Sequence, residues 1–168
     1  MAFFDFIKAA GEKLFPTRSA SAAPQPSGAG QPSAADKSAA ADAAAGDAIL
    51  NYIKSQNLDA TALTVTYDSG TEVVTVYGVA KDQATKEKII LCCGNVANVS
   101  RVDDKMSVEQ SGPEAKFYTV KSGDTLSKIS KDAYGDANQY TKIFEANRPM
   151  LKNPDKIYPG QVLRIPPA

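Results

Sequence analysis

Few side chains of this chain could carry chemistry of their own. Histidine is absent from the 168 residues, so the commonest general base and the commonest ligand of transition metals are both missing. The two cysteines, Cys92 and Cys93, are neighbours, and this spacing fits neither a zinc site nor a redox motif. We therefore expect two buried free thiols, and we expect the protein not to be an enzyme.

The acidic residues do not form a cluster either. Asp103 and Asp104 are adjacent in a predicted strand, where neighbouring side chains point to opposite faces and cannot share an ion. Glu12, Glu87 and Glu145 lie in separate predicted elements, with no sequence reason to pair. The sequence contains no D-x-[DN]-x-[DN]-G loop of the kind that binds calcium. These patterns give no support to a side-chain site for a divalent cation.

Charge and hydropathy bound the partners and the location. The 19 basic and 19 acidic residues balance, so neither nucleic acid nor an anionic membrane is a favoured partner. No segment approaches the roughly 18 apolar residues of a membrane span. Charged residues interrupt the N-terminal segment, which therefore does not resemble a signal peptide. We expect a cytoplasmic protein without stable insertion into a membrane.

The C-terminal residues 117–166 have the clearest pattern of elements. A short strand is followed by two helices, with apolar positions such as Leu126, Ile129 and Ile143, and then by a closing strand. This order and the motifs VKSGDTLSKI, IFEAN and IYPGQVLRIP resemble the LysM module. LysM modules usually bind N-acetylglucosamine-containing glycans. The resemblance implies a glycan groove formed by Gly123, Asp124, Thr125, Leu126, Asn147, Ile157 and Tyr158.

Residues 47–110 are predicted to form a second small α+β unit. A helix, two alternating strands, a second helix ended by Gly94 and a last strand over 99–108 follow one another. This αββαβ order and the segments ATKEKII and VSRVDD resemble a BON domain. The predicted fold is thus α+β, with two small domains separated by a hinge over 111–116 and therefore in contact with each other.

The N-terminal part is predicted to hold one helix and a linker. Residues 1–15 fit a short amphipathic helix, because apolar residues recur at helical spacing. Such a short helix is marginal alone, so we expect it to pack on the domain over 47–110. Residues 16–46 are rich in alanine, proline and serine and are predicted to be a flexible linker. Part of the stretch from Ala34 to Ala48 could be helical, because alanine is the best helix former.

The order of these parts is similar to that of the bacterial cytoplasmic potassium-binding proteins, in which a BON domain precedes a LysM domain. Residues 1–15, called the leader below, contribute the motif FDFIKAAGEKL to this resemblance. The resemblance implies selective binding of K⁺ over Na⁺ and compaction of the two domains on binding. A large monovalent cation is well satisfied by several neutral oxygens that replace its water shell.

Two predicted helix ends could supply such oxygens, because a helix C-terminus leaves four carbonyl groups without partners. One end lies near Gly11 and the other near Gly94, and docking of the leader beside the second helix would bring both sets together. With the resemblance as the guide, we expect K⁺ to be bound by the main-chain oxygens of Ile7, Ala10, Glu12, Gly94, Val96 and Val99.

Two other functions stay open at this point. A peptidoglycan-binding protein of the cell envelope would use the LysM groove, although the same residues also have an ordinary role in capping and turning the fold. Association with a membrane through the phenylalanines of the leader would be weak, because the apolar face is short and carries few basic residues. A K⁺ sensor or buffer is the main hypothesis.

Overall fold

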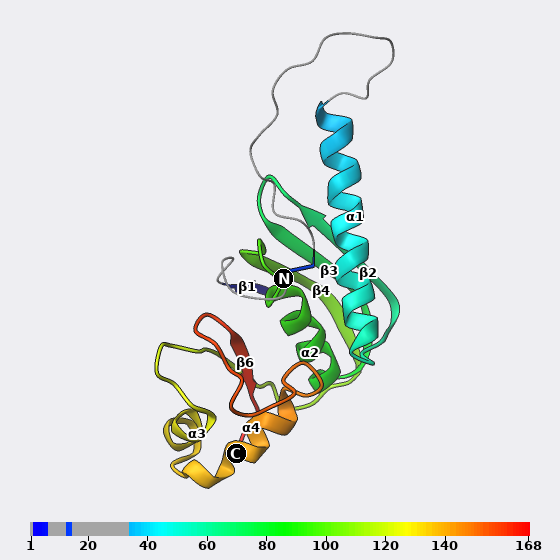
Figure 1. The fold of residues 1–168 in the computed structure, drawn as a ribbon. Helices are drawn as coiled ribbons and strands as arrows, with labels where there is room; N and C mark the ends of the chain where they lie inside the picture. The colour runs from blue at the N-terminus through cyan, green and yellow to red at the C-terminus, as the bar shows by residue number, and fades with distance from the viewer. Residues whose placement is uncertain (1, 7–12, 15–33) are drawn as a thin grey trace, which may run out of the picture.

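The computed structural model describes residues 2–6, 13–14 and 34–168 of the chain. Two units follow one another, one with a four-stranded sheet and two helices, the other with a two-stranded sheet and two short α-helices (Figure 1). This arrangement confirms the predicted α+β class.

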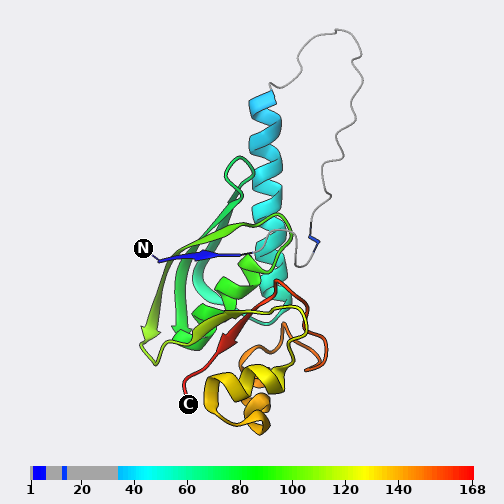
Figure 2. The same ribbon diagram turned by 90° about the vertical axis from the view of Figure 1, so that its left-hand side faces the viewer.

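The first unit is built around a mixed sheet. Its elements are α1 (Ala34–Ser55), β2 (Ala60–Asp68), β3 (Val73–Asp82), α2 (Gln83–Gly94) and β4 (Arg101–Gln110). β3 pairs antiparallel with β2 and parallel with β4, because α2 carries the chain back across the sheet between β3 and β4. α1 contacts β2, and α2 contacts β3 and β4, so the two helices lie side by side on the sheet (Figure 2).

The core of this unit follows the periodicity of its elements. Val74 and Val76 alternate on β3 and are fully buried, and Ile49 and Ile53 of α1 occupy one helical face above the sheet. Gly46 lets α1 approach the sheet closely, because a Cβ at this position would lie only 2.8 Å from the carbonyl oxygen of Val65. The predicted helices and strands of this region are therefore confirmed.

At residues 2–5 the structure contradicts the predicted helix over 1–15, while residues 7–12 lie outside the described residues. Ala2–Asp5 form strand β1, which pairs antiparallel with β4 and gives the sheet order β1-β4-β3-β2. Phe4 and Phe6 are half-buried against the core while Asp5 is exposed, which is the alternation of a strand. The strand is favoured because its hydrogen bonds satisfy main-chain N–H and C=O groups on the otherwise open edge of β4.

The linker predicted over 16–46 is wrong for its last part, because α1 begins at Ala34. Alanine is the best helix former, and it extends α1 beyond the part of the helix that packs on the sheet (Figure 2). Ala45 and Gly46 are buried where that packing begins. Residues 16–33 lie outside the described residues.

The second unit has the predicted order of strand, helix, helix and strand. β5 (Lys116–Thr119) pairs antiparallel with β6 (Val162–Ile165), and α3 (Leu126–Tyr134), the 3-10 helix η1 (Ala137–Gln139) and α4 (Tyr140–Ala146) lie between them. Its separate core is formed by Val120, Leu126, Ile129, Ile143, Leu151, Leu163 and Ile165.

Candidate functional site

The loop from Gly94 to Val99, called the 94–99 loop below, is buried and tightly held. α2 ends at Gly94, and the N–H of Asn95 donates to the carbonyl oxygen of Leu91 at 2.9 Å. Val96 and Val99 are fully buried, and the Val99 N–H closes a turn on the Val96 carbonyl at 3.2 Å. These contacts fix the directions of the carbonyl groups in the loop.

The 94–99 loop offers main-chain oxygens as its chemical groups. Among the described residues, no hydrogen bond of a turn, loop or side chain ends on the carbonyl oxygen of Gly94 or Val99. The Asn98 carbonyl is different, because it accepts a hydrogen bond from the Tyr67 hydroxyl at 2.8 Å. In the part of the chain that the structure describes, no group of three or more cysteine or carboxylate side chains could hold a metal ion.

The leader meets this loop through Phe6. The Phe6 N–H donates to the carbonyl oxygen of Ser100 at 2.8 Å, and the ring lies directly on Gly94, where a Cβ would overlap it. Phe6 and Leu14 both pack against the core of the first unit. The structure thus brings Gly94, Val96 and Val99 together beside the start of the leader. Three predicted ligands lie outside the described residues: Ile7, Ala10 and Glu12.

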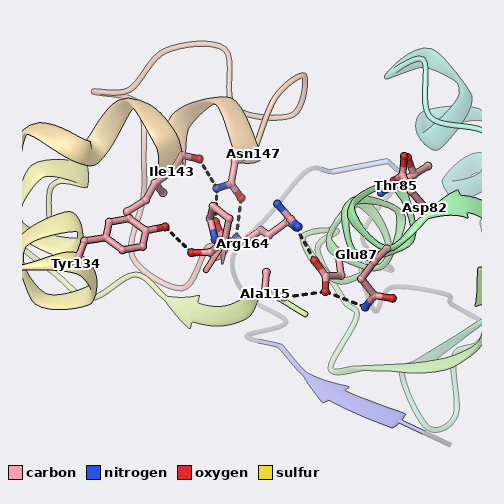
Figure 3. Close-up of polar contacts among 10 residues, drawn as sticks. Asp82, Thr85, Glu87, Ala115, Tyr134, Ile143, Asn147 and Arg164 are labelled. Atoms are coloured by element: carbon pink, nitrogen blue, oxygen red, sulfur yellow. Dashed lines mark hydrogen bonds and ion pairs between the residues drawn. The ribbon is translucent and has the colours of Figure 1, made fainter. Parts of the chain in front are cut away.

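A buried ion pair joins the two units. Arg164 on β6 places its Nε 2.6 Å from the Oε2 of Glu87 on α2, and their side chains are 9% and 3% exposed (Figure 3). The other carboxylate oxygen of Glu87 accepts hydrogen bonds from the Ala115 N–H and the Gln83 amide, both at 2.9 Å. No sequence pattern predicts this pair, because its members lie 77 positions apart and no spacing rule connects them.

Three further contacts cross between the units. The Asn95 carboxamide exchanges two hydrogen bonds of 2.9 Å with the main chain of Val162 on β6. The ring of Phe4 on β1 lies 4.9 Å from that of Phe117 on β5, measured between centroids. Met150 packs against the core of the first unit. The leader and the 94–99 loop therefore both touch the second unit.

The predicted glycan-groove residues at the start of α3 serve the local fold. Thr125 is the N-cap of α3 and accepts the Lys128 N–H at 3.2 Å. Asp124 accepts the Lys121 N–H at 2.9 Å and the Tyr118 hydroxyl at 2.8 Å. These hydrogen bonds, led by that from the Lys121 N–H, lower the pKa of Asp124 to about 2.

The other groove residues are divided between the surface and the core. Gly123 is exposed at a φ of 83°, whereas Leu126 is buried. Asn147 is buried, donates to the carbonyls of Ile143 and Arg164, and accepts the Arg164 N–H at 2.7 Å (Figure 3). Its carboxamide is therefore already used within the fold. The remaining residues of the predicted groove, Ile157 and Tyr158, are half-buried.

The cysteines are free and buried, as predicted. Burial raises the pKa of Cys92 to about 12 and that of Cys93 well above its usual value. Because the thiolate is the reactive form, neither thiol is suited to nucleophilic or redox chemistry.

Comparison with known proteins identifies both units. The BON domain model matches residues 41–110 and the LysM domain model matches residues 118–166. Over 166 residues the chain is 44% identical to the potassium binding protein Kbp of Escherichia coli O6:H1, a match that covers 99% of each chain.

Two other relatives share shorter parts. An uncharacterized protein of Deinococcus radiodurans is 57% identical over 49 residues, which are 29% of this chain and 19% of that protein. The endolysin of Bacillus phage B103 is 32% identical over 90 residues, which are 54% of this chain and 31% of the endolysin.

None of the described helices is both long and apolar enough to span a bilayer. The match to Kbp over 99% of both chains and the order of the two matched domains establish the family. The chain belongs to the family of the potassium binding protein Kbp, in which it carries a BON domain followed by a LysM domain.

Proposed function

We propose that this protein binds K⁺ selectively in the cytoplasm, as a sensor or buffer of the ion, and that it is a binding protein rather than an enzyme. The proposal is supported by the relative that is named for potassium binding. That match extends over 99% of both chains, so the leader, the BON domain and the LysM domain are all included in it.

The observation that carries the proposal is the contact between the leader and the 94–99 loop. Phe6 lies on Gly94, and both Phe6 and Leu14 pack against the core of the BON domain. The 94–99 loop, on its side, has carbonyl oxygens with accepting capacity. We assign the ligands to main-chain oxygens on both sides: Ile7, Ala10, Glu12, Gly94, Val96 and Val99.

The chemistry of these groups favours K⁺ over divalent cations. Neutral carbonyl oxygens replace the weakly held water shell of a large monovalent ion. Calcium and magnesium instead favour carboxylate-containing sites, which compensate for the loss of their tightly held water. The described residues contain no such cluster of carboxylates.

Isothermal titration with KCl and NaCl, together with thermal unfolding in the same salts, tests the proposal. K⁺ is expected to bind and to raise the melting temperature well above the value in equimolar Na⁺, because a ligand of the folded state stabilises it by mass action. Equal melting temperatures in the two salts and no heat of K⁺ binding would refute the function.

Substitution of Gly94 tests the site itself. Gly94→Ala places a methyl group where the Phe6 ring lies, so the ring must be displaced from the loop and the K⁺-dependent rise in melting temperature should be lost. Gly112→Ala is the matched control, because a Cβ there meets its nearest atom at an ordinary 3.6 Å and should leave the response intact. A full response in Gly94→Ala would place the ion elsewhere.

Peptidoglycan binding is not the function proposed for the LysM domain. Asn147, one of the predicted groove residues, is buried and uses both ends of its carboxamide inside the fold. We therefore expect the protein to stay in the supernatant when insoluble peptidoglycan is sedimented. Saturable co-sedimentation would revive the glycan-binding alternative.

A further inference from the structure

The outer edge of the LysM sheet is completed by two asparagine side chains. Asn147 bonds to both main-chain groups of Arg164, and Asn95 does the same to Val162. Each carboxamide offers one acceptor and two donors, so it can replace the peptide group of a neighbouring strand. Val162 and Arg164 are alternate residues of β6, as required of groups on one edge of a strand.

The two asparagines come from different domains. Asn147 directly follows α4 and belongs to the LysM domain itself. Asn95 belongs to the BON domain, lies 67 positions from Val162, and is half-buried at the end of α2. Half of this edge is therefore closed only when the LysM domain docks on the BON domain.

The place of Asn95 in the chain links docking to the proposed ion site. Its two sequence neighbours are Gly94 and Val96, whose carbonyl oxygens are both assigned to K⁺ above. The Gly94 oxygen lies in the peptide plane directly before the Asn95 Cα, and the Val96 oxygen lies in the plane that follows the next residue. An ion held by both oxygens therefore holds the backbone on either side of Asn95, and with it the direction in which the carboxamide leaves the chain.

We infer that Asn95 is the positioning residue that couples K⁺ binding to docking of the LysM domain, an inference that rests on the proposed function. With the ion bound, the carboxamide stands ready for both main-chain groups of Val162. Coupling is reciprocal, so a docked LysM domain raises the affinity for K⁺ by the factor by which K⁺ favours docking.

The buried ion pair across the same interface provides a control. Glu87 lies two helical turns before Gly94, roughly 10 Å along the axis of α2, and it does not belong to the 94–99 loop. Its contact with Arg164 stabilises docking with or without the ion. Glu87→Gln should therefore loosen the interface in both conditions while the response to K⁺ is kept.

The test compares full-length wild type, Asn95→Ala, Asn95→Asp and Glu87→Gln. K⁺ affinity is measured by isothermal titration, and compaction by small-angle scattering in KCl and in choline chloride. Asn95→Asp keeps the acceptor for the Val162 N–H but sets a carboxylate against the Val162 carbonyl, so it tests the second hydrogen bond without shortening the side chain. Circular dichroism confirms that each variant is folded.

Both Asn95 variants are expected to bind K⁺ about tenfold more weakly, within the range usual for coupled sites, and to show no compaction on adding K⁺. Glu87→Gln should be more extended than wild type in both salts, but its radius of gyration should still be smaller in KCl than in choline chloride. Asn95 variants that match wild type, or that behave like Glu87→Gln, would overturn the inference and leave the proposed function standing. Wild type that takes up no K⁺ would overturn both.

Discussion

Neutralising Glu87 should separate the two domains before it unfolds either of them. Its carboxylate accepts three hydrogen bonds, from Arg164 at 2.6 Å and from Ala115 and Gln83 at 2.9 Å each. Glu87→Gln keeps the size of the side chain but removes its charge. The NH₂ group of the new amide then faces one of the N–H donors that the carboxylate had accepted. The guanidinium of Arg164, whose side chain is 9% exposed, is left without a counter-charge.

The size of the effect follows from that stranded charge. Removing one member of a buried ion pair usually costs about 3–5 kcal/mol. The Arg164 side chain can escape this penalty if the LysM domain moves away and exposes it to water. The loss of stability is therefore limited by the free energy of docking, and an increase in the radius of gyration should accompany it.

Urea unfolding and small-angle scattering of Glu87→Gln measure these two quantities. The double variant Glu87→Met/Arg164→Met is the control, because an apolar pair of similar volume restores a buried contact and should be more stable than the single variant. If Glu87→Gln lost less than about 0.5 kcal/mol and kept the wild-type radius, the interface would not be closed around this pair and the reasoning would be refuted.

Three further predictions concern single positions. Asp124 has a pKa of about 2 against its usual 3.8, so its contribution to LysM stability should be complete above about pH 4 and lost as the pH falls through 2. The melting temperatures of wild type and Asp124→Asn should therefore converge over that range, and a difference that stays constant with pH would contradict this prediction. Asp82 caps α2 by accepting the Thr85 N–H at 2.7 Å, so Asp82→Ala should lose about 1 kcal/mol in urea unfolding while Asp82→Asn recovers most of it; equal losses in the two variants would argue against the cap. Cys92 and Cys93 should react with a thiol reagent only as fast as the protein unfolds, and immediate labelling in native buffer would show that they are not buried.

The elements of both domains could be predicted because each carries its own local signal. Val74 and Val76 alternate as strand residues must, and Ile49 and Ile53 repeat at helical spacing. Short polar residues mark where helices start, as Thr125 does for α3. Such signals depend on neighbours in sequence, so the sequence alone sufficed for the order of helices and strands in both domains.

The prediction of a helix at the start of the leader was wrong because the local sequence pattern there fits both a helix and a strand. Phe3 and Phe6 fit one face of a helix, whereas Phe4 and Phe6 fit one face of a strand. The choice is made by the open edge of β4, which is far away along the chain and pairs with residues 2–5. An edge that needs a partner is a property of the folded domain, and no local pattern reveals it.

The interface shows the same limit for single residues. Asn147 is predicted from the sequence to lie in a glycan groove and Asn95 is assigned no role, yet each side chain takes the place of a neighbouring strand along β6. Such a role is fixed by the direction in which Val162 and Arg164 turn their main-chain groups, because alternate residues of a strand turn these groups to the same edge. Because the two asparagines bind main-chain atoms of β6, which every residue carries, the sequence of β6 does not reveal these contacts. Their discovery requires the folded chain, and the same holds for any ion bound by main-chain carbonyls.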